Sequence, residues 1–462
     1  MSIFRIAVVS VVCLFGAYSS FSETKKLGDY VVSLKTTKPE AVYKVGDKAE
    51  FEIKIFKDGK PFDGAELSCV ISKDGVAPLS KEKVSNSGAV HKFVGSLAEP
   101  GFLKCAVSVK FPDQKKQLAM LCGAGFEPEK ILPSLPAPED FQSYWDAQKA
   151  MLAKIPMNMK LQLRNNVLAE DKSVPKKIKD AIDVYIVKAD TFNGILDAYL
   201  FMPKNAKAKS LPLVILPHGA GVRYSRFGSG AEFAAAGYMA IDFNALGLDS
   251  DGTQERLKEL KKEHAGYWLK KADNRDTNFF RTMYLRLCRA MDVGMAQPQW
   301  DGKNLIVYGT SQGGAQALAA GGLYSDKVSL VCAFVPALCD QTGMVKNRIN
   351  GWPHYIKPDK DGKYGQYDKN LFEAIRYVDA MNFAPLIKAP VVFVVDLSDD
   401  VCQPSSCFAA YANIKAPKTL ITNPEARHAV PQSCYSKVRE LIKGYMKEFF
   451  TITRSGNTVF QK

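Results

Sequence analysis

The chain has 462 residues, enough for two or three domains at about 150 residues each. Hydrophobic residues make up 47% and charged residues 24%, which excludes a disordered chain, a coiled coil and a collagen-like fibre. The formal net charge is +14, but no lysine- or arginine-rich tract with interleaved aromatic residues stands out. This pattern favours a solvated basic surface, and we expect no nucleic-acid partner. The alternative is a surface that attracts acidic polysaccharide or a negatively charged envelope.

The N-terminus has the layout of a secretory signal peptide. Arg5 precedes an apolar run from Ile6 to about Tyr18, and mostly small residues follow up to Ser22. The run is shorter than the ~20 apolar residues that a membrane span requires. We therefore expect residues 1–22 to be cleaved after Ser22 and the protein to be secreted or periplasmic, with no stable membrane span.

Residues 23–126 are predicted to form a small all-β domain. Apolar and polar residues mostly alternate in segments 30–34, 49–56, 66–71, 89–94 and 104–109, and turn signals such as Asp-Gly and Pro-Gly separate them. Such segments favour a β-sandwich, with an immunoglobulin-like arrangement as the expected form. Cys69 and Cys105 lie in two of the predicted strands. They are expected either to bridge the two sheets or to stay as buried thiols.

A proline-rich stretch, residues 127–137, is predicted to be a stiff linker to a second domain, residues 138–462. In that domain, near-continuous apolar segments alternate with helical ones, which is typical of a mainly parallel sheet covered by helices on both faces. The predicted strands are 184–187, 196–202, 213–216, 239–243, 305–308, 330–334, 391–395 and 419–422. The clearest predicted helices are 279–296, 312–322 and 434–450.

The strongest chemical motif joins one of these strands to the helix that follows it. An apolar strand ends at Gly309, and Ser311 and Gly313 complete a G-x-S-x-G pattern before an alanine-rich helix. A nucleophile on such a sharp turn needs a strained backbone and neighbours without bulk. Ser311 is therefore the predicted nucleophile, and the backbone N–H of Gln312 is a predicted oxyanion donor.

A serine nucleophile needs a base, and in this fold the acid and then the histidine follow it along the chain. His428 lies between the last predicted strand and the last helix, where the base is expected. His354 precedes the strand that should carry the acid, so a surface loop role is expected for it. Asp396, Asp399 and Asp400 all follow that strand, and position alone does not separate them.

The second oxyanion donor is expected after strand 213–216. There, His218 and Gly219 precede Ala220, and small residues would let the N–H of Ala220 approach the oxyanion. We expect His218 to support this loop rather than to act as a base.

The second domain resembles the acetyl xylan esterase/cephalosporin-C deacetylase family of α/β-hydrolases, carbohydrate esterase family 7, over most of residues 130–450. In that family the triad acid stands three residues before a cysteine, which implies Asp399 here. The resemblance also implies that Cys339 and Cys402 are free buried thiols. The matching segments are 138–145, 218–219, 284–292, 309–314, 397–405 and His428.

Three departures from the family pattern are visible. Ala220 stands where the family has a tyrosine, residues 244–246 replace an Arg-Gly-Gln motif, and Ala429 replaces a frequent acidic residue. The resemblance thus implies intact hydrolytic residues with an altered acyl pocket and altered oligomer contacts. It also implies a homo-oligomer, an assembly that the additional N-terminal domain could block.

Together these features predict a secreted serine esterase with Ser311, His428 and Asp399 as catalytic residues and Gln312 and Ala220 as backbone oxyanion donors. An acetylated sugar or xylo-oligosaccharide substrate is implied by the resemblance, and no metal or cofactor is expected. One alternative is a serine hydrolase acting on other carboxylic esters or peptides. A second is a carbohydrate-binding surface protein with an inactive hydrolase domain.

Overall fold

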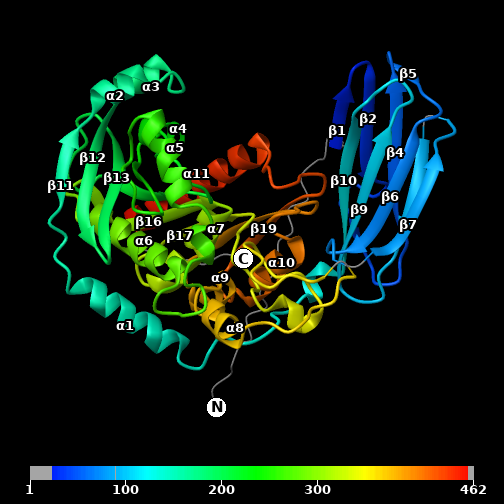
Figure 1. The fold of residues 1–462 in the computed structure, drawn as a ribbon. Coiled ribbons are helices and arrows are strands. Elements are labelled where there is room, and N and C mark those ends of the chain that lie inside the picture. Colours follow the sequence, from blue (N-terminus) through cyan, green and yellow to red (C-terminus); the bar gives the residue numbers. More distant parts are fainter. Residues whose placement is uncertain (1–22, 77, 89, 360, 456–462) are drawn as a thin grey trace.

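The computed structural model describes residues 23–455 apart from 77, 89 and 360, so the predicted signal peptide lies outside the described residues. An all-β region, blue in Figure 1, stands beside a larger α/β region. Both parts of the predicted fold class, the α/β-hydrolase core and the preceding all-β region, are confirmed. Among the described helices, none is long and apolar enough to cross a bilayer.

The N-terminal region consists of two five-stranded sheets that enclose a common apolar core. Strands such as β2 alternate buried and partly exposed residues along their length, which is the pattern of a strand with one face on a core. The first sheet contains β1 (Glu23–Leu27), β2 (Tyr30–Thr36), β4 (Ala49–Lys57), β5 (Lys60–Pro61) and β8 (Val90–Gly95). The second contains β3 (Val42–Tyr43), β10 (Gln117–Phe126), β9 (Gly101–Lys110), β6 (Glu66–Lys73) and β7 (Pro78–Ser85).

The idea that Cys69 and Cys105 bridge the two sheets is wrong. They lie on β6 and β9, which are neighbouring strands of the same sheet. Their Sγ atoms are 3.6 Å apart and both are buried thiols. The alternative expectation, that both cysteines are buried free thiols, is confirmed.

The α/β region is built on a nine-stranded sheet, most of which is parallel. Three strands at one edge pair antiparallel with their neighbours, and all the remaining strands are parallel to one another. In spatial order the strands are β11 (Lys160–Leu163), β12 (Ile182–Thr191), β13 (Gly194–Pro203), β15 (Met239–Phe243), β14 (Leu211–Pro217), β16 (Trp300–Thr310), β17 (Leu330–Phe334), β18 (Val391–Asp396) and β19 (Lys418–Asn423). The central strands β14, β15, β17 and β18 are buried along their whole length, because helices cover both faces.

Two apolar clusters lie on opposite faces of this sheet. The larger packs against α1 (Phe141–Ala153), α6 (Phe279–Met295), α7 (Gln312–Leu323), α9 (Ala380–Phe383) and α10 (Pro404–Asn413). The smaller packs against α2 (Asn165–Glu170), α3 (Lys176–Ala181), α4 (Gly228–Ala235) and α11 (Gln432–Ser455). Longer connections contain α5 (Gln254–Glu263) and α8 (Lys369–Arg376).

The N-terminal region packs against the segment that follows β18. Phe102 of β9 lies against Phe408 of α10, with ring centroids 5.3 Å apart. The backbone N–H of Gly123 on β10 donates to Ser398 Oγ at 2.8 Å. Figure 1 shows β9 beside α10. The all-β region thus touches the part of the α/β region where the acid of the predicted triad is expected.

Candidate active site

Ser311 lies at the turn between β16 and α7, at the carboxyl end of a central parallel strand. Its φ of 61° and ψ of −121° place it in a region that residues other than glycine rarely adopt. A Cβ at Gly309 would lie 2.1 Å from the carbonyl oxygen of Gly313, and one at Gly313 would lie 2.3 Å from that of Pro217. The two glycines of the motif therefore allow the close packing that holds the strained serine.

The structure brings Ser311, His428 and Asp399 into one hydrogen-bonded chain. His428 Nε2 lies 3.0 Å from Ser311 Oγ, and His428 Nδ1 lies 2.8 Å from Asp399 Oδ2. Asp399 is fully buried, and its Oδ1 accepts backbone N–H bonds from Val401 and Cys402 at 2.8 and 2.9 Å. Both oxygens of this carboxylate are thus held, and one of them points at the imidazole.

The other two aspartates of this loop face different partners. Asp396 accepts from the side-chain amide of Asn423 at 2.6 Å, and burial raises its pKa to about 7. Asp400 pairs with Arg427 at the surface. Of the three candidate acids, only Asp399 bonds to His428. This is the position that the family resemblance implied.

His354 lies in a loop, as expected, but its side chain is half-buried beside the site rather than open to solvent. Its side chain is only partly exposed, and Nδ1 lies 2.7 Å from the carbonyl oxygen of Asn350. The loop packs inward because it lies against the loop of the catalytic acid, near Val401. His354 therefore lies close to the site without joining the Ser311–His428–Asp399 chain.

The surroundings of His428 favour its protonated form. Burial opposes protonation, but the hydrogen bond and the negative charge of Asp399 outweigh it, and the pKa of His428 is raised above its ordinary value. A buried carboxylate that accepts from Nδ1 also fixes the tautomer in which Nε2 faces the serine with its lone pair. The imidazole is thus prepared to take the Ser311 proton and to carry the resulting charge.

The sequence predicts the N–H groups of Gln312 and Ala220 as oxyanion donors, and Ala220 lines the same cavity as Ser311. Gln312 is the first residue of α7, whose leading N–H groups have no partner within the helix. Ala220 follows β14, and its N–H donates to no described residue. His218 is buried with Nε2 2.5 Å from Asp242 Oδ1, which fits the expected supporting role. This arrangement can accept an oxyanion between two elements.

Tyr267 is a site residue that the sequence analysis missed. It belongs to a connection that is rich in lysine and glutamate, yet it is buried. Its hydroxyl donates to Gln312 Oε1 at 2.7 Å and accepts from the N–H of Gly221 at 3.3 Å. One phenol therefore links the two elements that supply the oxyanion donors. The Tyr-Trp pair within this polar segment was the only available signal.

A cavity of about 940 Å³ opens over Ser311 and His428. Its walls are mixed, with Trp352 and Val401 on the apolar side and Arg223 and Tyr224 on the polar side. A space of this size holds a small-molecule ester or part of a carbohydrate chain.

Asp399, Cys402 and His428 could in principle bind a metal ion, because their ligand atoms lie within 4.8 Å of one another. Both ring nitrogens of His428 already face Asp399 and Ser311. Burial raises the pKa of the Cys402 thiol well above its ordinary value, and a thiol that keeps its proton is a poor ligand. The donor set fits proton transfer better than metal binding.

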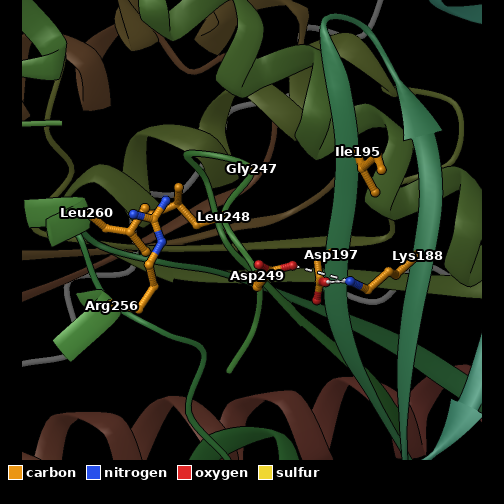
Figure 2. A pocket seen from close by; sticks show the side chains of 8 residues that line it. All are labelled: Lys188, Ile195, Asp197, Gly247, Leu248, Asp249, Arg256 and Leu260. Atoms are coloured by element: carbon orange, nitrogen blue, oxygen red, sulfur yellow. Dashed lines mark hydrogen bonds and ion pairs between the residues drawn. The ribbon is translucent and has the colours of Figure 1, made fainter. Parts of the chain in front are cut away.

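A second pocket, of about 330 Å³, contains none of these groups (Figure 2). In it, Lys188 pairs with Asp197 at 2.9 Å and Asp249 at 3.2 Å. Arg256, on the other side of this pocket, pairs with Glu263 at 2.8 Å. Its charges are therefore neutralised within the protein, and it offers no nucleophile.

The sheet, the strand-to-helix serine and the serine–histidine–aspartate chain define an α/β-hydrolase. Residues 129–442 match the acetyl xylan esterase (AXE1) family model. The acetyl esterase Axe7A of Xylanibacter ruminicola is 30% identical over 410 residues, 87% of either chain. The chain therefore belongs to the acetyl xylan esterase (AXE1) family and is a carboxylic ester hydrolase, which confirms the resemblance seen in the sequence.

Solved structures share the fold of the α/β region. The acetyl xylan esterase from Paenibacillus sp. R4 is 23% identical and superposes with a TM-score of 0.56, covering 69% of this chain and 98% of its own. Acetyl xylan esterase 1 from Thermoanaerobacterium sp. JW/SL YS485 is 21% identical with a TM-score of 0.54 and the same coverage.

Proposed function

We propose that this protein is a secreted or periplasmic serine esterase that removes acetyl groups from acetylated sugars or xylo-oligosaccharides. The observation that carries the proposal is the hydrogen-bonded chain from Ser311 Oγ through His428 to Asp399. Membership of the acetyl xylan esterase (AXE1) family and the likeness to an acetyl esterase supply the acetyl substrate.

In the first half of the reaction, Ser311 Oγ attacks the ester carbonyl carbon while His428 Nε2 takes its proton. The carbonyl oxygen becomes an oxyanion, which accepts from the N–H groups of Gln312 and Ala220. Asp399 stabilises the imidazolium through Nδ1. His428 then gives the proton to the departing sugar oxygen, and an acetyl group remains on Ser311.

In the second half, water replaces the sugar. His428 takes a proton from the water, whose oxygen attacks the acyl carbon, and the oxyanion again forms at the same two amides. Collapse of this intermediate returns the proton to Ser311 Oγ and releases acetate. Side chains, backbone amides and water carry out every step.

The acyl preference separates this proposal from its first alternative. A methyl group at Ala220, in place of the ring found in the family, leaves room for longer acyl chains and supports an esterase of broader specificity. Hydrolysis of 4-nitrophenyl esters from acetate to octanoate, by wild type and Ser311→Ala, distinguishes the two. We expect acetate to be the best substrate and the variant to lose nearly all activity. A preference for longer chains would remove the deacetylase assignment.

The second alternative is a carbohydrate-binding protein with an inactive hydrolase domain. Equal inertness of wild type and Ser311→Ala on every ester would favour it.

The proposed export rests on the N-terminal sequence, and Edman sequencing of the mature protein from the producing cell tests it. A mature N-terminus at or near Glu23 is expected, whereas an intact Met1 would contradict export.

A further inference from the structure

The cavity over Ser311 has a polar wall whose chemistry the hydrolytic mechanism does not use. It is made by the connection after β14, which carries Arg223 and Arg226, and by the connection after β15, which carries Ser250 and Asp251. Arg223 is partly buried and Arg226 is exposed. These two cations face a cavity that a substrate must enter.

Every carboxylate that lines the cavity is already satisfied by another group. Asp242 faces His218 at 2.5 Å, and Glu232 pairs with Arg439 at 2.6 Å. Asp251 accepts from Arg164 at 2.7 Å and from Tyr199 at 2.8 Å, and Asp171 accepts from the N–H of Ser173 at 2.7 Å.

By contrast, neither Arg223 nor Arg226 forms an ion pair with a described residue. Within the part of the chain that the structure describes, the Arg223 guanidinium makes a single hydrogen bond, from Nη2 to the carbonyl oxygen of Gly219 at 3.2 Å. Burial, followed by the positive charge of Arg226, lowers the pKa of Arg223, while the negative charge of Asp242 opposes this without an ion pair to Arg223. The cavity wall therefore holds two arginine side chains that have no ion-pair partner among the described residues and could bind an anionic group of a ligand.

Three buried polar atoms of the same wall also have no hydrogen-bond partner among the described residues. They are Arg223 Nε, Ser225 Oγ and Ser250 Oγ. Ser250 is only 1% exposed, and its backbone carbonyl accepts from the N–H of Ser225 at 3.0 Å, so the two serines are fixed side by side. Buried donors without partners are costly and uncommon in folded proteins. A bound group that accepts hydrogen bonds would satisfy them.

This wall is close to the reacting serine. A Cβ built on Gly219 would lie 3.5 Å from Arg223 Nη2 and 3.8 Å from Ser311 Cβ. The Arg223 guanidinium and Ser311 therefore lie on either side of Gly219, close to each other. An anionic group bound here would sit within about one sugar unit of the ester.

We propose that Arg223 and Arg226, with Ser225 and Ser250, form a subsite for a carboxylate on the sugar side of the substrate, as carried by a uronic-acid unit near the acetyl group. A guanidinium presents a planar fork of N–H groups that matches a carboxylate in two parallel bonds. The sugar side is chosen because the acyl group of an acetyl ester carries no charge. The inference rests on the proposed function for its substrate class.

The kinetic test uses two acetylated xylo-oligosaccharides that differ in one group. One carries a uronic-acid branch, and the other carries the same branch with its carboxylate reduced to an alcohol. We expect wild-type kcat/KM to favour the first by about tenfold at low salt, since hydrogen bonds between charged groups are worth about that factor. Added salt should reduce the ratio because Arg226 is exposed.

Substitutions connect the preference to the two arginines. Arg223→Gln and Arg226→Gln should each lower the ratio of the two kcat/KM values, and the double variant should bring it to about one. Arg226→Lys, which keeps the positive charge, should retain part of the preference that Arg226→Gln loses. Arg256→Gln is the matched control, since that arginine lies in the second pocket, and it should keep the wild-type ratio. A wild-type ratio near one, or a double variant that keeps the preference, would overturn the proposal.

A binding measurement separates this inference from the proposed function. Calorimetric titration of Ser311→Ala with the two deacetylated oligosaccharides requires no ester hydrolysis. Tighter binding of the uronate form, together with no release of acetate by wild type, would leave the subsite standing and reject the deacetylase. Equal binding of both forms, with normal acetate release, would reject the subsite alone.

Discussion

At Ser311 the chain passes from strand to helix in a backbone conformation that serine rarely adopts. The flanking glycines, the preceding strand and the following helix make this residue predictable from sequence, and chain order makes His428 predictable. Asp399 was not separable from Asp396 and Asp400 by position, because the direction in which a loop carboxylate turns depends on its tertiary partners. Tyr267 was missed because the connection around it, residues 253–275, is rich in lysine and glutamate while its own ring is buried.

Replacing the orienting carboxylate should change both rate and pH dependence. The base must be neutral to accept a proton, and Asp399 raises the pKa of His428. Activity should therefore fall as the pH drops through the raised pKa of His428. In Asp399→Asn, kcat should fall by about 10³–10⁴-fold, and the acid limb of kcat/KM should move to lower pH. An acid limb that stays in place would show that another group sets it.

Tyr267 should matter through its hydroxyl. In Tyr267→Phe, Gln312 Oε1 and the N–H of Gly221 lose their shared partner, which loosens the two elements that hold the oxyanion. We expect kcat for 4-nitrophenyl acetate to fall by about tenfold with little change in KM, consistent with the loss of one or two hydrogen bonds. Tyr238→Phe is the control, because the Tyr238 hydroxyl bonds to no described residue. Equal effects of the two substitutions would contradict the assignment.

At the scale of elements, the hydrophobic pattern of the sequence predicts the strands that have one or both faces buried. Alternation located β2, β4 and β6, and continuous apolar runs located β14, β17 and β18. The exposed edge strand β7 was missed, because it is polar along nearly all of its length. Lys104 shows the limit of alternation: its place in β9 indicates an exposed side chain, but it is 4% exposed, since the α/β region covers it.

The contact between β10 and the loop after β18 gives a prediction at this scale. A Cβ at Gly123 would lie 2.0 Å from the carbonyl oxygen of Leu397, two residues before Asp399. Gly123→Ala must therefore displace the loop that carries the acid, and we expect kcat to fall at least about tenfold. Gly365→Ala, where a Cβ meets nothing within 4 Å, is the matched control. Unchanged kcat in Gly123→Ala would show that the loop is insensitive to the N-terminal region.

Over the whole molecule, the two regions share a buried polar junction. Asp74 is fully buried, and burial raises its pKa while the charge of Lys104 opposes that rise. Burial in turn lowers the pKa of Lys104 to about 8, and its ammonium donates to Gln403 of the α/β region. Sequence could not reveal this junction, because Lys104 and Gln403 are 299 positions apart along the chain and no pattern in the sequence pairs them.

Breaking this junction on one side should be costlier than removing both charges. Lys104→Met removes the positive charge that favours the Asp74 carboxylate and leaves Gln403 without its donor, and it should lower the free energy of unfolding by about 1–3 kcal/mol. Adding Asp74→Asn should recover most of that loss, because no uncompensated charge is then buried. Urea denaturation of the single and double variants completes the cycle. Strictly additive losses would show that the two charges do not interact.

The central claim is that Ser311 carries the acyl group, and trapping the intermediate tests it most directly. The enzyme is mixed with 4-nitrophenyl acetate, quenched in acid within the first turnover, digested and mapped by mass spectrometry. The account predicts an acetyl group on the peptide that contains Ser311 in wild type and none on that peptide in Ser311→Ala. Acetyl transfer to another residue, such as the neighbouring Cys402, or turnover that persists in the folded Ser311→Ala variant, would contradict it.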